Sequence, residues 1–279
     1  MVVQPARMTT RCRRLLLAAL LSFAGAEKAA CAAADWTGYE RLDRPQVVDA
    51  LAHATPAAPA DFYAKNLSGL DLSGIDFKGA NLAAAVLNGS KLQHANLANC
   101  KLSVSFAEGA DFSSANLAGA MMFSMQLKGA IFKGANLAGA RFIGDMSRAN
   151  LQDANLTGLR AAADMKNQSM GLMRASFTSA DLRGANFTGA DLGRADFSFA
   201  NLSGAKLPGA NLSGAEFAST DLTGADLSDA DLRGAKFIDT RFTGAILKGA
   251  RFEGASWRGV QGMENAAARG ARDVPADVH

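Results

Sequence analysis

The feature that most constrains this chain is a pattern that repeats every five residues between about Lys65 and Gly259. Each unit has Leu or Phe at its centre, Ala two residues earlier, Asn or Asp one residue earlier, and often Gly two residues later, as in ANLSG at 200–204. Five residues advance about 500° around an α-helix, and an odd period sends successive side chains to opposite faces of a strand. The chain can therefore bury every centre only if it turns a corner once per unit and its turns stack.

The aromatic side chains indicate how many units make one turn. Five of them lie at intervals of twenty residues, which is four units: Phe177, Phe197, Phe217, Phe237 and Trp257. Asn96, Asn116 and Asn136 share this interval, as expected for amides that hydrogen-bond from one turn to the next. The spacing therefore predicts a four-sided coil with Leu, Phe and Ala inside.

Charged residues follow the same interval. One predicted column reads Asp181, Asn201, Asp221, Arg241, and a second reads Asp191, Asn211, Asp231, Arg251. In both columns an amide separates two carboxylates and a cation comes last, which keeps like charges out of direct register. Asp196, predicted to lie next to Glu216, is the exception.

These units resemble the pentapeptide-repeat family over the whole stretch from Lys65 to Gly259. The resemblance implies an all-β fold, a right-handed quadrilateral parallel β-helix, and the length of the repeat predicts about ten coils. It also implies roles known in the family, in which some members imitate a DNA duplex and shield a topoisomerase. Those members are cytoplasmic and acidic, and this chain departs from both properties.

The two ends of an open coil would expose strand edges and apolar interior, so we expect covers there. Asp43 followed by Pro45 predicts a short helix that carries Val47, Val48 and Leu51 and caps the first coil. The predicted organisation is a signal peptide and leader at 1–34, a cap helix and linker at 35–64, a repeat β-helix at 65–259 that is irregular over 143–171, and a tail at 260–279 that is a weak helix or loose.

The first residues have the form of a secretory leader. A basic region spans 7–14, an apolar run of about ten residues follows at 15–24, and small residues offer cleavage after Ala26 or Ala34. An apolar run this short cannot span a bilayer, so we expect no membrane insertion once the leader is removed. The protein is therefore expected in the periplasm or elsewhere in the bacterial cell envelope.

The charge balance argues against a nucleic-acid partner. Loss of the four leader arginines takes the formal charge from +3 to about −1, which is neither a broad basic footprint nor the acidity of a DNA mimic. We expect a protein partner, and the sequence leaves the oligomeric state open, a dimer included.

The repeat loses its phase between Phe142 and Leu172, and methionines gather nearby. Leu151 and Leu156 come one residue early, and the stretch 158–171 restores the count, so we expect a loop or a distorted coil there. One interpretation is an adaptable apolar surface that binds a partner through five residues: Met121, Phe123, Met146, Met165 and Met170. The other is that methionine fills gaps in an irregular core.

No arrangement of residues indicates catalysis, a metal or a cofactor. The three histidines, at 53, 94 and 279, lack ligands at metal spacing, with His94 expected at an outward corner. Cys100 occupies an inward Ala position and is expected to be an inert buried thiol. Asp221, Asp226 and Asp231 are expected on different sides of the coil.

The sequence therefore favours an exported, non-catalytic structural or protein-interaction module. Two alternatives stay open: a DNA-mimicking protein that protects a topoisomerase, and an envelope enzyme with an unrecognised site in the 158–171 stretch, where Asp164 and Lys166 would be the residues to test.

Overall fold

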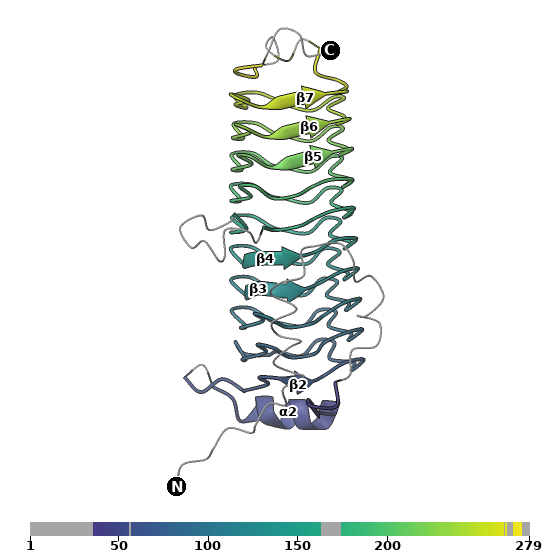
Figure 1. The fold of residues 1–279 in the computed structure, drawn as a ribbon. Coiled ribbons are helices and arrows are strands. Elements are labelled where there is room, and N and C mark those ends of the chain that lie inside the picture. Colours follow the sequence, from purple (N-terminus) through teal and green to yellow (C-terminus); the bar gives the residue numbers. More distant parts are fainter. Residues whose placement is uncertain (1–35, 56, 163–173, 265, 267–269, 275–279) are drawn as a thin grey trace.

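The chain forms a stack of four-sided coils, a parallel β-helix (Figure 1). The computed structural model describes residues 36–55, 57–162, 174–264, 266 and 270–274. The predicted fold class is confirmed. The predicted leader at 1–34 lies outside the described residues.

Parallel pairing holds each coil to the next, and partners lie twenty residues apart in the regular part, as in Asp76 with Asn96 and Asn96 with Asn116. One side, which we call side A, is the column of residues Asp61, Asn81, Lys101, Met121, Arg141, Arg160, Asp191, Asn211, Asp231, Arg251 and Arg272. Sides B, C and D begin five, ten and fifteen residues later, at Asn66, Asp71 and Asp76. Sides A and C are therefore opposite each other.

Each corner is a hydrogen-bonded turn that follows the buried centre of a unit. In the first coil, the N–H of Ile75 donates to the carbonyl of Leu72 at 3.3 Å, and Gly74 between them has φ of 69°. A positive φ at the third position of a turn is that of a type II turn and favours glycine. Leu72 N–H and Gly74 N–H then donate to the next coil, at 2.7 and 2.9 Å. His94 lies at such a corner, as predicted, with φ of 57°.

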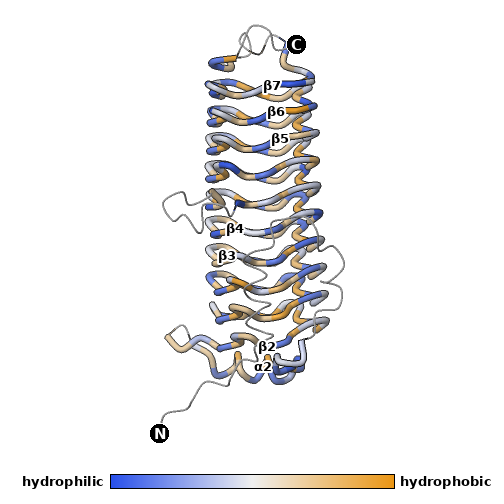
Figure 2. The backbone as a smooth tube through the Cα atoms, in the orientation of Figure 1, coloured by the Kyte–Doolittle hydropathy of each residue, from blue (hydrophilic) through white to orange (hydrophobic). Residues whose placement is uncertain are grey.

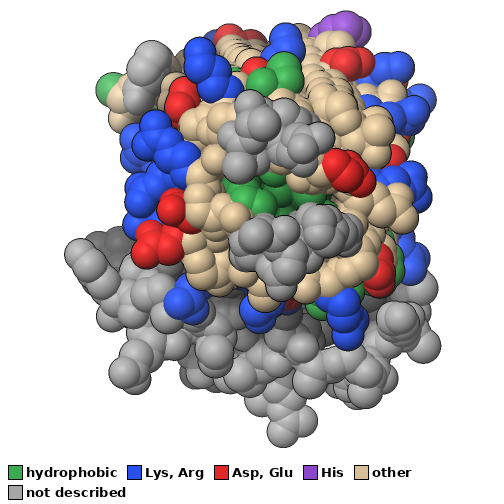
Figure 3. All heavy atoms as spheres, turned by 90° about the horizontal axis from the view of Figure 1, so that it is seen from above, with side chains coloured by type: hydrophobic (Ala, Val, Ile, Leu, Met, Phe, Trp, Pro, Cys, Tyr) green, Lys and Arg blue, Asp and Glu red, His purple; other side chains and the backbone are tan. Residues whose placement is uncertain are grey.

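The core is the narrow interior of the coil, where the Leu and Phe centres and the preceding Ala residues are almost all inaccessible to solvent. Figure 2 shows apolar and polar residues interspersed along the coils. Viewed along the axis, hydrophobic side chains lie in the middle and charged ones around the perimeter (Figure 3).

The predicted aromatic column is confirmed. Phe177, Phe197, Phe217 and Phe237 stack with ring centroids 5.1, 5.3 and 5.1 Å apart, and Trp257 continues the stack at 4.7 Å. Stacking at one coil spacing adds aromatic contact to the burial of each ring.

The predicted amide ladder is also present, on side D. The side-chain amide of Asn116 donates to Oδ1 of Asn96 at 3.0 Å, and that of Asn136 donates to Asn116 at 3.1 Å. Asn155 continues the ladder to Asn136 at 3.0 Å. Each amide therefore binds its neighbour across the coil boundary.

The charge columns pair as predicted, and the exception has a structural explanation. Asp196 pairs with Glu216 in neighbouring coils of side B. Arg174 contacts both carboxylates: its Nη2 lies 2.9 Å from Asp196 and its Nη1 lies 2.9 Å from Glu216. Lys236 also contacts Glu216, at 3.2 Å. Like charges in register are thus compensated by cations from other coils.

Only a few coils have strands longer than a single bridge. These are β1 (Glu40–Arg41), β2 (Lys65–Asn66), β3 (Met121–Gln126), β4 (Arg141–Asp145), β5 (Glu216–Ala218), β6 (Lys236–Ile238) and β7 (Ser256–Arg258). They form three parallel sheets: β1 with β2, β3 with β4, and β5 with β6 and β7. The short bridges elsewhere follow from the corner that interrupts every unit.

The helix α2 (Arg44–Ala52) covers the N-terminal end of the stack (Figure 1). Asp43 caps it as predicted: its carboxylate accepts from Gln46 N–H at 2.9 Å, and Gln46 Oε1 accepts from Asp43 N–H at 2.8 Å. Of the three apolar residues that the predicted helix carries, Val47 and Leu51 are buried against the coil and Val48 is 46% exposed.

The β-helix extends beyond both predicted limits. Asp61 already pairs with Asn81, so the first side begins before Lys65. At the other end Gln261 pairs with Arg241, and Arg272 pairs with Arg251. The described residues after Gly259 therefore continue the coil, and the prediction of a weak helix or loose tail was wrong for them.

The predicted break in phase has its origin in the pairing of β3 with β4. Six residues of β3 face five of β4, and the register shifts between Phe123 and Met125. A Cβ at Gly144 would lie 2.7 Å from the carbonyl oxygen of Met125, so the shift needs glycine there. Asp145 then pairs with Ser176, thirty-one residues later, which restores the phase.

Candidate functional site

A row of cationic and apolar side chains lies on side A, in the coils around β3 and β4. Lys101 pairs with Met121, Met121 with Arg141, and Arg141 with Arg160, so these four residues occupy consecutive coils. Phe123 follows Met121 on the same outward face of β3, because Met122 between them points into the core. We call these five residues the basic–apolar stripe.

The cations of the stripe have no acidic partner among the described residues. Lys101, Arg141 and Arg160 are exposed, and none of them forms an ion pair with a residue that the structure describes. The Arg141 guanidinium lies over the ring of Phe123, 5.1 Å from its centroid. This cation–π contact holds the aromatic ring and the charge together on the surface.

Two of the five residues predicted to bind a partner belong to the stripe. Met121 and Phe123 are partly exposed. Met146 is fully buried, as is Met125 at the register shift, so Met146 fills the core there and its prediction as a surface contact was wrong. Met165 and Met170 lie outside the described residues.

The predicted irregular stretch at 158–171 begins later than expected. The N–H of Gly158 donates to the Thr188 carbonyl, Leu159 is buried, and Arg160 pairs on both sides. Residues 158–162 therefore belong to a regular coil. The rest of the stretch, including Asp164 and Lys166, lies outside the described residues.

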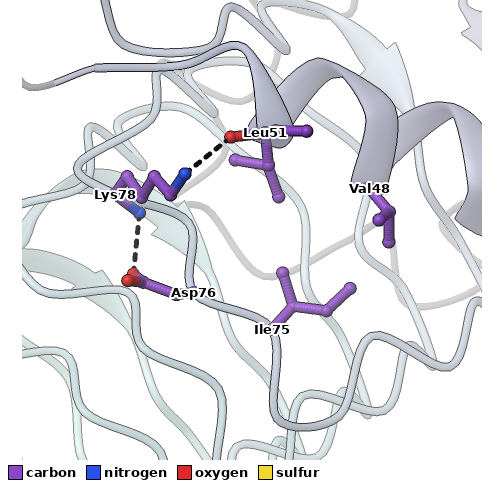
Figure 4. Close-up of a pocket in the computed structure, with 6 residues that line it drawn as sticks. Val48, Leu51, Ile75, Asp76 and Lys78 are labelled. Carbon is purple, nitrogen blue, oxygen red and sulfur yellow. Dashed lines mark hydrogen bonds between the residues drawn. The ribbon is translucent and has the colours of Figure 1, made fainter.

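A shallow cleft of about 280 Å³ lies between α2 and the first coil (Figure 4). Val48, Leu51 and Ile75 form its apolar walls. Its polar groups already have partners, because Lys78 Nζ donates to the Leu51 carbonyl at 2.9 Å and Asp76 accepts from Lys78 N–H at 3.0 Å. The cleft lies at the contact between the cap helix and the first coil, and the hydrogen bond of Lys78 stabilises that contact.

The remaining candidates for chemistry are separated or buried. Asp221, Asp226 and Asp231 lie on sides C, D and A, as predicted. Cys100 is buried, and burial raises the pKa of its thiol to about 12. A thiol held protonated in this way is a poor nucleophile.

Two negative findings apply to the described part of the chain. No three His, Cys, Asp or Glu side chains there lie close enough together to hold a metal ion. No helix in that part is long and apolar enough to cross a bilayer.

The family model for pentapeptide repeats matches in eight copies that together span 66–158 and 172–260. The chain belongs to the pentapeptide-repeat family. The break between the matched ranges coincides with the interval at which Asp145 pairs with Ser176.

Several solved pentapeptide-repeat structures are similar to this one. HetL from the cyanobacterium Nostoc sp. strain PCC 7120, involved in heterocyst differentiation regulation, is 28% identical; the match covers 72% of this chain and 86% of HetL, with a TM-score of 0.48. A thylakoid-lumen protein of Arabidopsis thaliana is also 28% identical, over 60% of this chain and 70% of its own, with a TM-score of 0.21.

A third similar structure is QnrB1, a plasmid-mediated fluoroquinolone resistance protein, which is 23% identical over 70% of this chain and 91% of its own, with a TM-score of 0.31. No curated protein matches this chain. Membership of the family is therefore shown by the repeats themselves. The assignment of the candidate site is based on the geometry of this pentapeptide-repeat protein.

Sequence reasoning missed the three cations of the stripe, although a signal for them existed. Lys101, Met121 and Arg141 are spaced by twenty residues, and Arg160 follows after nineteen because of the register shift. Applying the coil interval to every residue type on side A would have brought Lys101, Met121 and Arg141 together, whereas the place of Arg160 depends on the register shift.

Proposed function

We propose that this pentapeptide-repeat protein is an exported, non-catalytic interaction module that binds a protein partner through the basic–apolar stripe. The observation that carries the proposal is the group of three exposed cations beside Met121 and Phe123, without acidic partners among the described residues. Some exposed cations elsewhere on the rod contact carboxylates, as Arg183 does, whereas others, such as Lys133 and Arg148, have no ion pair with a described residue. The stripe is distinguished by three such cations in one column beside two apolar side chains. Pentapeptide-repeat proteins are typically structural or interaction modules, which agrees with this role.

Export is proposed from the leader-like residues at 1–34, with a mature start near Glu27 or Asp35. The stripe also bears on the DNA-mimicking alternative. A surface that imitates DNA needs a continuous negative potential, and the stripe places positive charge on three of four consecutive coils of side A.

The experiment that tests the proposal is site-specific photo-crosslinking in cells, with a photoreactive phenylalanine analogue in place of Met121. The matched control carries the same group in place of Lys133, which is exposed on side C, opposite the stripe. Cell fractionation and intact-mass measurement of the N-terminus accompany the crosslinking.

We expect an envelope protein to be captured from position 121 and not from position 133, and a mature start near Glu27 or Asp35. Capture of a topoisomerase by a cytoplasmic chain that begins at Met1 or Met8 would contradict both export and the proposed partner. Equal capture from the two positions would contradict the assignment of the stripe.

A further inference from the structure

We propose that the occupant of the basic–apolar stripe is a short, extended peptide segment of the partner, aligned with the rod axis and carrying the pattern acidic–x–apolar–x–acidic. This inference rests on the proposed function and names the chemistry of the partner. Its basis is the order of charges and apolar groups along side A and the spacing that the coils impose on them.

The length of the stripe matches a segment of five residues in an extended chain, because three coil spacings and four residue steps both span roughly 13–14 Å. Neighbouring coils are about 4.8 Å apart, so Met121, Arg141 and Arg160 lie roughly 5, 10 and 14 Å from Lys101 along the axis. Alternate residues of an extended peptide lie about 6.7 Å apart on one face. A first carboxylate at Lys101 therefore places the third residue between Met121 and Arg141, and the fifth between Arg141 and Arg160.

The chemistry of the stripe follows the same order. The third residue of such a peptide would meet Met121 and Phe123, whose thioether and ring form an adaptable apolar contact. The fifth would meet two guanidinium groups, which bind carboxylates with paired N–H donors. Because Arg141 already contacts the Phe123 ring, its guanidinium is held near the middle of the stripe.

The stripe is too short for a long polyanion. Above Arg160 the next residue of side A is the exposed Asp191, and below Lys101 the column continues with Asn81 and the exposed Asp61. A nucleic acid or an anionic bilayer laid along the rod would meet these carboxylates, and like charges in close contact are unfavourable. A segment of five residues fits between them.

The test measures binding of fluorescein-labelled ESFSE to the full mature chain by fluorescence anisotropy at low and physiological salt, with QSFSQ as the uncharged probe. The stripe variant is Arg141→Glu with Arg160→Glu. The control is Lys133→Glu with Arg148→Glu, which makes the same change of charge at exposed positions away from side A. Thermal unfolding of both variants shows whether they remain folded. Vesicles of phosphatidylglycerol provide an alternative anionic ligand.

We expect ESFSE to bind the wild-type chain at least tenfold more tightly than QSFSQ. The stripe variant should lose that difference, and the control should keep it. Equal binding of both peptides, or unchanged binding by a folded stripe variant, would overturn the inference. Vesicle binding that depends on the stripe, without peptide binding, would also overturn it. If crosslinking from position 121 still captures an envelope protein in that case, only the peptide chemistry is wrong and the proposed function stands.

Discussion

The carboxylate of Asp229 occupies the space in which a Cβ on Gly249 would lie. Asp229 is at a corner of one coil, with φ of 56°, and Gly249 is at the same corner of the next coil. Asn99 with Gly119, Asp153 with Gly184, and Asp239 with Gly259 show the same relationship. An Asn or Asp at a corner thus folds over the next corner, where any Cβ would have to displace that side chain and glycine fits without a clash.

The first prediction separates this steric requirement from the cost of a positive φ. Gly249→Ala should destabilise the protein by about 1–3 kcal/mol more than Gly254→Ala, because Gly254 has nothing within 4 Å of its Cβ position. Both positions have similar φ, 74° and 67°, so the left-handed cost of about 1–2 kcal/mol is common to both. Urea unfolding measures the difference between the two variants. Adding Asp229→Gly to Gly249→Ala should remove most of the extra loss of stability, because the clashing carboxylate is then absent. Equal losses at the two glycines would contradict the steric explanation.

The amide ladder on side D gives the second prediction. Asn116 donates to Asn96, accepts from Asn136, and accepts from the N–H of Ala118 at 3.2 Å. Asn116→Ala leaves these groups without their partner and should cost about 1–3 kcal/mol in the free energy of unfolding. Asn116→Asp keeps both accepted bonds and loses the donated one, so chemical denaturation should place it between Ala and wild type. A loss below about 0.5 kcal/mol for Asn116→Ala would show that the ladder contributes little.

Cys100 gives a prediction about pH. Burial raises the pKa of the thiol from 9.0 to about 12, so between these values the unfolded chain releases a proton that the folded chain keeps. The free energy of unfolding is therefore unaffected by this group below about pH 9 and falls above it, by about 1.4 kcal/mol per pH unit. Cys100→Ala should remove this component from the alkaline unfolding curve.

The same burial predicts that Cys100 resists a thiol reagent such as dithionitrobenzoate in the native protein and reacts after denaturation. Rapid reaction of the folded chain would show that the coil opens locally around Cys100.

Arg174 provides a prediction about salt. It contacts both Asp196 and Glu216, at 2.9 Å each, and these carboxylates pair in register. Arg174→Gln should destabilise the protein by about 0.5–1 kcal/mol at low salt, because like charges then face each other with only Lys236 nearby. At 1 M salt most of the loss should disappear, since screening weakens the repulsion. Arg183→Gln, which removes a cation from a single carboxylate, is the matched control.

Much of this architecture follows from the sequence because every repeat unit has the same pattern of apolar and polar residues. A Leu or Phe every five residues can be buried only in a cornered coil, and the twenty-residue interval of Phe177, Phe197 and Phe217 fixes the number of sides. The cap helix could also be predicted from the sequence, since Asp43 and Pro45 are local signals whose effect does not depend on distant residues.

The tertiary structure alone decided the features that depend on contacts between coils. The register shift at Gly144 places Arg160 beside Arg141 and buries Met146, and neither result is visible in the local pattern. The contact between Trp36 and Phe106, whose ring centroids are 4.8 Å apart, is likewise not visible in the local pattern. Trp36 covers the apolar side chain of Phe106 at an outward position of side B. The five-residue period determines which side chains point inward, because that is a local property of the turn. Which outward residues become neighbours depends on how many residues each coil contains, and that number is set by the pairing between stacked coils.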